Sequence, residues 1–209
     1  MKYSGTLLLV AVMLVGFSSS TAFAQAGIYW PANVLEEGQL VAGPGIVFGS
    51  FPTFGIVGQV RYGMAENLDI SPKFAFARDS KLNFFTVGGD LRYGYLQEAA
   101  GDDYDVSFVG AFSVTHRSKF TWLTLGFGGQ FGRSIPIEGS DTVLAPYGGL
   151  LLGVSHASIA DNSDTSFGGI LPIGNQFTLK ENLAAHFELD VLFGTDTELQ
   201  VALGINYLY

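Results

Sequence analysis

Apolar and polar residues alternate along most of the chain from about residue 39 to its end. In residues 54–64, for example, apolar residues occupy most even positions, whereas glutamine, arginine and glycine occupy most odd ones. Successive side chains of a β-strand point to opposite faces, so this period predicts strands with one apolar and one polar face. Turn-forming residues separate ten such segments, at 39–49, 54–64, 68–77, 85–95, 104–115, 120–132, 142–155, 166–178, 185–193 and 198–209.

The length of these segments predicts the fold class. They span about 10–14 residues, whereas strands of globular proteins average about 5–6 and a tilted membrane strand needs about 9–11. We therefore expect an all-β protein, a transmembrane antiparallel up-and-down β-barrel of ten strands, with eight strands as the alternative. A secreted soluble β-barrel is the alternative fold, because the period is the same whichever face points inward. Four prolines, Pro44, Pro72, Pro146 and Pro172, predict bulged or shortened strands where they occur.

The first 24 residues have the pattern of a secretory signal peptide. Lys2 precedes an apolar run from Leu7 to Phe17, and Ala22–Ala24 form an A-x-A processing site. The run is too short for a membrane-spanning helix, which needs about 20 residues. The expected organisation is a signal peptide at 1–24, a periplasmic lead-in at 25–37 and the barrel at 38–209.

Composition excludes several classes of function. The chain has 48% hydrophobic and 14% charged residues, a net charge of −9 and no cysteine. The acidic balance argues against nucleic acid as a partner, and the lack of cysteine removes disulfides, thiolate metal sites and cysteine nucleophiles. No glycine-rich phosphate motif and no short spacing of histidines occurs, so we expect neither a cofactor nor a metal.

The last strand carries a resemblance to a known family. Leu203, Ile205, Tyr207 and Tyr209 alternate up to a terminal aromatic residue, as in the small bacterial outer-membrane β-barrel proteins, although Tyr209 stands where phenylalanine is usual. The resemblance implies a porin-like protein of the Gram-negative cell outer membrane, in contact with outer-membrane lipids. It also implies recognition by the barrel-insertion machinery through the C-terminal strand. With both termini in the periplasm, the turns at 65–67 and 180–182 are periplasmic, and the external loops are near 50–53, 78–81, 116–119, 156–165 and 194–197.

Two sets of residues are candidates for the membrane boundary and the lumen. An aromatic girdle, which suits the headgroup boundary, is predicted from Tyr62, Tyr93, Tyr95, Tyr104, Trp122, Tyr207 and Tyr209. A lumen charge network is predicted from Arg61, Lys73, Asp90, Arg92, His186, Glu188 and Asp190. The network either selects small solutes or ions or fills a narrow barrel with structural ion pairs.

The expected function is therefore a narrow passive pore or a structural barrel of the envelope, and not an enzyme. Two enzyme alternatives remain: a protease-like site around His186, and a lipid A deacylase-like pair in His156 and Ser158, which share a strand face. A third alternative is a loop-mediated adhesin, which the short external loops argue against.

Overall fold

The chain forms long antiparallel strands in a computed structural model that describes residues 30–49, 54–79, 82–118, 120–159, 162–194 and 197–209. The predicted signal peptide and residues 25–29 of the lead-in lie outside the described residues. The strands are β1 (Leu40–Gly49), β2 (Phe54–Ala65), β3 (Leu68–Asp79), β4 (Leu82–Leu96), β5 (Asp105–Arg117), β6 (Phe120–Gly132), β7 (Ile135–Pro136), β8 (Val143–Ile159), β9 (Asn162–Lys180), β10 (Leu183–Phe193) and β11 (Glu198–Leu208). A 3-10 turn, η1 (Glu98–Ala100), lies between β4 and β5.

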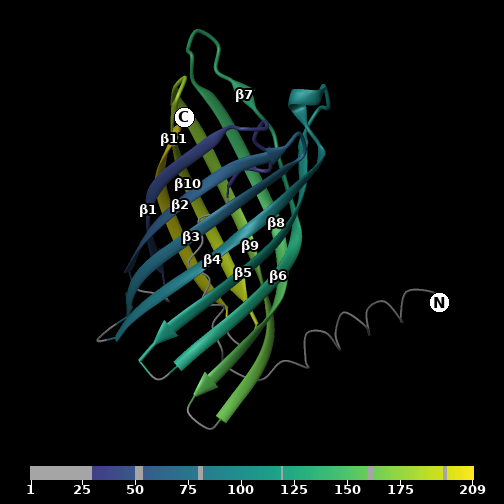
Figure 1. Cartoon of the computed structure of the whole chain (residues 1–209). Coiled ribbons are helices and arrows are strands. Elements are labelled where there is room, and N and C mark those ends of the chain that lie inside the picture. The colour runs from purple at the N-terminus through teal and green to yellow at the C-terminus, as the bar shows by residue number, and fades with distance from the viewer. Residues whose placement is uncertain (1–29, 50–53, 80–81, 119, 160–161, 195–196) are drawn as a thin grey trace, which may run out of the picture.

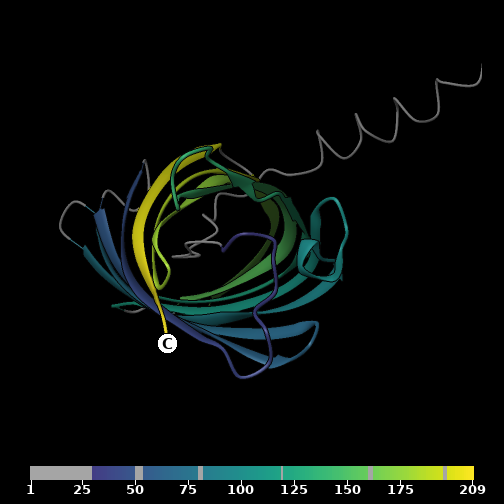
Figure 2. The ribbon, with the colours of Figure 1, turned by 90° about the horizontal axis from the view of Figure 1, so that it is seen from above.

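Pairing closes the sheet into a barrel. Each long strand pairs with its neighbours in sequence, β1 pairs with β11, and β6 pairs with β8 (Figures 1 and 2). The two-residue strand β7 pairs only with β8 and extends the barrel wall at one end. The prediction of a closed antiparallel barrel of ten long strands is confirmed, with β7 as an addition. We call the end that carries the C-terminus, β7 and η1 the C-terminal end; it is at the top of Figure 1.

No helix in the described part of the chain is long and apolar enough to cross a membrane.

The two faces of the wall differ sharply in polarity. Large apolar side chains face outward and are exposed, with Phe74 at 59% and Phe127 at 65% of their full accessible area. Charged and amide side chains face inward and are buried, among them Arg92 and Glu188 at 0%. Exposed phenylalanine around a buried polar interior is stable only if lipid covers the outside, as in membrane barrels.

The prediction of bulged or shortened strands at the prolines is wrong. The register shifts at Gly63/Ala65, Gly94/Leu96 and Leu183/Ala184, and at none of the four prolines. Each strand residue directs its N–H toward one neighbour only, so a proline removes one ladder bond on one side.

The ladder accommodates this loss by a local gap. Pro44 lies where the β1–β11 pairing is interrupted, between the pairs Ala42–Tyr207 and Gly45–Gly204. Its pairing to Gly58 on the other side continues without a change of register. The strands therefore keep their full length.

The loop predicted at 156–165 is also shorter than expected. His156 pairs with Thr165 and Ile159 with Asn162, so both arms of this hairpin belong to β8 and β9. The polar residues of the segment suggested a loop, but strand pairing continues through them. Residues 160–161 lie outside the described part of the chain.

Candidate functional site

The inward-facing positions of β2, β3 and β4 form a cluster of buried charges. Arg61 Nη2 lies 2.6 Å from Asp69 Oδ2. Lys73 forms an ion pair with Asp90, whose second carboxylate oxygen is 4.0 Å from Arg92 Nη2. Every one of these side chains is at least nine-tenths buried. Because an unpaired charge is costly away from water, this pairing makes the charged interior tolerable.

A second polar cluster lies on β10. Glu188 accepts a hydrogen bond of 2.7 Å from the hydroxyl of Tyr147, whose ring covers Gly174. The ring of His186 covers Gly204, and its Nδ1 is 2.8 Å from the amide nitrogen of Asn206. In both cases a glycine on the adjacent strand leaves room for a ring, because any Cβ there would collide with it.

The structure places all seven residues of the predicted lumen network inside the barrel. Arg61, Lys73, Asp90 and Arg92 lie together, whereas His186, Glu188 and Asp190 follow one another along β10. Residues that were not among those candidates also take part, and Asp69, Tyr147 and Trp30 are three of them. Asp69 and Tyr147 occupy inward-facing positions of their strands, which the alternation of apolar and polar residues could have predicted. Trp30 lies in a segment in which apolar and polar residues do not alternate. Whether the network has a function beyond filling the lumen stays a prediction.

The segment that leads into β1 lies inside the barrel at the C-terminal end. Figure 2 shows it crossing the ring of strands, and Trp30, Ala32, Val34 and Leu35 are buried there. The indole N–H of Trp30 donates to Ser71 Oγ at 2.8 Å, and its ring centroid is 6.0 Å from that of His186. The residues predicted as a lead-in thus pack against the lumen wall from Trp30 onward.

Charged lumen side chains bind the backbone of this segment. Arg92 Nη1 donates to the carbonyl of Pro31 at 2.8 Å, and Arg61 Nη2 donates to the carbonyl of Asn33. The N–H of Leu35 donates to Asp69 Oδ2 at 3.2 Å. The backbone of every second residue, Pro31, Asn33 and Leu35, is therefore hydrogen-bonded to the lumen wall. Arg61 and Asp69 form an ion pair with each other and also bind the segment.

Inward-facing glycines make room for the segment. A Cβ at Gly63 would lie 1.9 Å from the carbonyl oxygen of Glu36, and one at Gly94 would lie 2.9 Å from Val34. At Gly132 it would lie 3.4 Å from the Cβ of Ala32. Three strands therefore carry a glycine where the segment approaches the wall.

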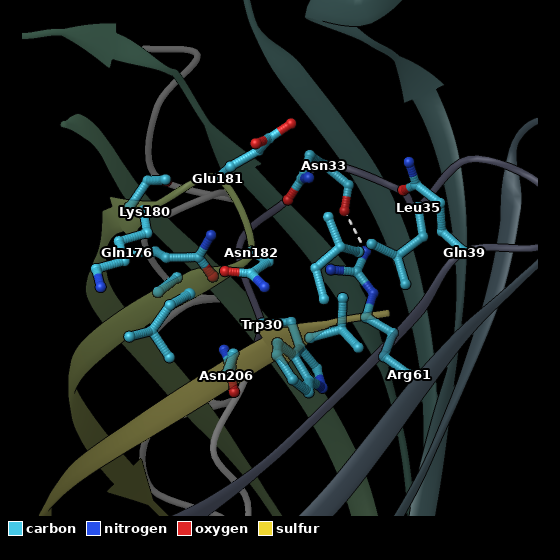
Figure 3. Close-up of a pocket in the computed structure, with 15 residues that line it drawn as sticks. Trp30, Asn33, Leu35, Gln39, Arg61, Gln176, Lys180, Glu181, Asn182 and Asn206 are labelled. Atoms are coloured by element: carbon cyan, nitrogen blue, oxygen red, sulfur yellow. Dashed lines mark hydrogen bonds between the residues drawn. The ribbon is translucent and has the colours of Figure 1, made fainter. Parts of the chain in front are cut away.

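A cavity of about 190 Å³ remains beside the segment at this end. Figure 3 shows amide side chains around it: Asn33, Gln176, Asn182 and Asn206, with Lys180 at the rim and Trp30 below. The carboxamide oxygen of Asn206, which is 97% buried, has no hydrogen-bond partner among the described residues. The lining suits water or a small polar solute.

The residues predicted as a girdle lie at two places. All six tyrosines face outward near the C-terminal end and are at least 40% exposed: Tyr62, Tyr93, Tyr95, Tyr104, Tyr207 and Tyr209. Trp122 does not fit the girdle, because it alternates with the outward-facing Leu123 and therefore faces inward. Its ring centroid is 6.3 Å from that of Phe84, a buried lumen residue near the opposite end.

The two histidines of the enzyme alternatives lie on opposite faces of the wall. His156 faces outward, and its Nδ1 is 2.9 Å from Thr165 Oγ1. His186 is in the lumen, where it contacts Trp30 and Asn206. No group of three or more histidine, aspartate or glutamate side chains in the described residues is placed to hold a metal ion.

No protein-family model and no curated protein matches the sequence. Among solved structures, the β domain of the Bordetella autotransporter BrkA is similar with a TM-score of 0.53 and 11% identity, over 83% of this chain and 100% of that domain. The N-terminal β-barrel domain of Pseudomonas aeruginosa OprF is similar with a TM-score of 0.42 and 11% identity, over 84% and 100% of the two chains. The outer membrane protein Omp33 of Acinetobacter baumannii is similar with a TM-score of 0.41 and 8% identity, over 83% of this chain and 99% of that chain. The similarity to the BrkA β domain shows that the chain shares the fold of that domain, here a closed antiparallel barrel of ten long strands.

Proposed function

We propose that the protein is an outer-membrane β-barrel whose lumen is closed at rest, so that it serves as a structural barrel of the envelope and not as a constantly open pore. The observation that carries this proposal is the complete burial of charged side chains in the lumen. Arg92, Asp69 and Glu188 are 0% exposed, although each belongs to the inner wall of the barrel. In an open aqueous pore such side chains would be in contact with water along the path.

Location in the outer membrane is part of this proposal. The apolar outer surface and the similarity in fold to outer-membrane barrels support it, together with the predicted signal peptide. The tyrosines near the C-terminal end suit the headgroup region of one leaflet, because their rings are apolar and their hydroxyls polar. We assign this end to the periplasm, where a C-terminal insertion strand would meet the barrel-insertion machinery.

Of the alternatives, the enzymes have less support than the closed barrel. His156 and Ser158 both face outward, but the nearest polar partner of the His156 ring is the hydroxyl of Thr165 rather than a carboxylate. His186 is buried beneath the segment that closes the C-terminal end. Neither arrangement has a histidine hydrogen-bonded to a carboxylate and open to a substrate. The adhesin alternative would need displayed surface, but the hairpin expected to supply its longest external loop is mostly paired strand.

Planar-bilayer recording of the purified, folded protein tests the proposal. We expect wild-type protein to insert and to remain silent at low voltage. Insertion is confirmed independently by heat-modifiable migration and by protection from protease in vesicles. Steady conductance of the wild-type barrel would refute the closed lumen, and recovery of the protein in the soluble periplasm would refute the membrane location.

A further inference from the structure

We propose that residues 30–36 are a displaceable plug, which occupies the C-terminal end of the barrel as a bound extended peptide and opens the lumen when it leaves. The proposal rests on the closed barrel proposed above and names the element that closes it. It differs from a fixed structural role, because a plug must detach while the ten strands of the wall stay paired.

The segment is bound by side chains of the wall and not by strand pairing. Residues 30–36 form no ladder with the long strands. Two backbone hydrogen bonds follow the segment, from Gly38 N–H to the carbonyl of Gly63 and from Gly63 N–H to the carbonyl of Gln39. They lie between the segment and the start of β1. Side chains from the wall hold the segment instead, through Arg92, Arg61 and Asp69 acting on the backbone of alternate residues. Binding of this kind is how a site holds an extended peptide, and it breaks without disturbing strand pairing.

Trp30 is the anchor of the segment. Trp30 is 1% exposed and is held on three sides: its N–H donates to Ser71, His186 contacts its ring, and the Arg61 guanidinium lies 5.8 Å from the ring centroid. A buried aromatic side chain that fills a pocket is a common anchor of a bound peptide. Loss of this one side chain should therefore release the segment.

Polar side chains line the lumen behind the segment. Several buried lumen side chains have polar atoms without a hydrogen-bond partner in the described part of the protein: Gln59, Gln130, Gln200, Ser107 and Ser113. Buried polar groups in proteins are normally satisfied by protein or by water, so water that entered the lumen would find free hydrogen-bonding groups at these positions. They extend from Ser107 near the C-terminal end to Gln200 near the opposite end. Release of the segment would open the C-terminal end of this polar interior to solvent.

Bilayer recording of variants tests the plug. Trp30→Ala should raise the open probability by about two orders of magnitude over wild type, as expected when a large buried anchor is removed. The matched control is Trp122→Ala, which removes the other tryptophan, remote from the segment, and should stay silent. A folded Trp30→Ala barrel that stays silent would overturn the plug but not the closed barrel. A conducting wild-type barrel would instead refute the closed barrel.

A disulfide gives a reversible version of the test. The chain has no cysteine, and a Cβ at Gly132 would lie 3.4 Å from that of Ala32, close to the separation of about 3.8 Å that a disulfide needs. Adding Ala32→Cys and Gly132→Cys to Trp30→Ala should silence the barrel when oxidised, and a reductant should restore its conductance. Equal conductance of the two forms would show that the segment does not control the path.

Labelling decides the question if Trp30→Ala does not fold. Ala32→Cys and Ala75→Cys place a thiol at equally small, buried inward positions, one on the segment and one on β3. In the otherwise wild-type barrel, a membrane-impermeant maleimide should label the first at least tenfold faster than the second. Equal rates would mean that the segment opens no more readily than the wall, and would overturn the proposal.

Discussion

Removal of the Asp69 carboxylate provides a direct test of the paired lumen. Asp69 is 0% exposed, lies 2.6 Å from Arg61 and also accepts the N–H of Leu35. The substitution Asp69→Ala leaves the Arg61 guanidinium, itself 2% exposed, without its counter-ion. Breaking a buried ion pair in this way costs about 3–5 kcal/mol of unfolding free energy. By contrast, the double substitution Arg61→Met with Asp69→Leu removes both charges and should recover most of the unfolding free energy that Asp69→Ala loses.

The measurement is urea unfolding of the refolded barrel in detergent or vesicles, followed by tryptophan emission. Trp122→Phe in the background leaves Trp30 as the only tryptophan, so the signal comes from the segment that the Arg61–Asp69 pair holds. The control is Glu66→Gln, which removes an exposed carboxylate from the β2–β3 turn and should change stability by less than about 0.5 kcal/mol. Solvent-exposed ion pairs contribute less than about 1 kcal/mol. If Asp69→Ala lowered the unfolding free energy by less than that, water would reach the Arg61–Asp69 pair and the lumen would not be closed.

Two further pairs of substitutions probe the inner and outer faces of the wall. Tyr147→Phe keeps the ring over Gly174 but removes the 2.7 Å hydrogen bond to Glu188, and should cost about 1–3 kcal/mol in the same urea assay. Tyr93→Phe, on the exposed outer face, is its control and should be close to neutral. Leu125→Arg puts a charge on the lipid-facing surface near the middle of β6 and should cost about 2–4 kcal/mol, whereas Phe131→Arg near the strand end should cost about 0–1 kcal/mol. If the two arginines lowered the unfolding free energy equally in vesicles, the middle of the bilayer could not lie at the height of Leu125.

Strand positions and strand faces could largely be predicted from the sequence. The odd positions of residues 55–63 face inward as the period requires, and Arg61 on that face indicates a polar interior. Where glycines interrupt the pattern the prediction fails. In β6, Gly126, Gly128 and Gly129 weaken the alternation, and Trp122 was assigned to the outer surface although it faces the lumen.

The candidate site was only partly predictable, for a different reason. Periodicity places Arg61, Asp69 and Arg92 on the inner face, but it says nothing about which of them meet. The pairing of Arg61 with Asp69 follows from the register of β2 against β3. The role of Trp30 had no signal at all, since a segment outside the strands has no period to show which way it faces.

Local properties of the chain were enough to predict its architecture: a period of two, long segments and charges on one face together specify ten strands and an inside-out barrel. Each of these properties depends on residues close together in the chain. How the interior is packed follows only from the folded barrel. It brings Trp30 and the backbone up to Leu35 against Arg61, Asp69 and Arg92 from three different strands, leaving room at Gly63, Gly94 and Gly132. Those contacts join segments far apart in sequence, and they exist only once the barrel has closed around them.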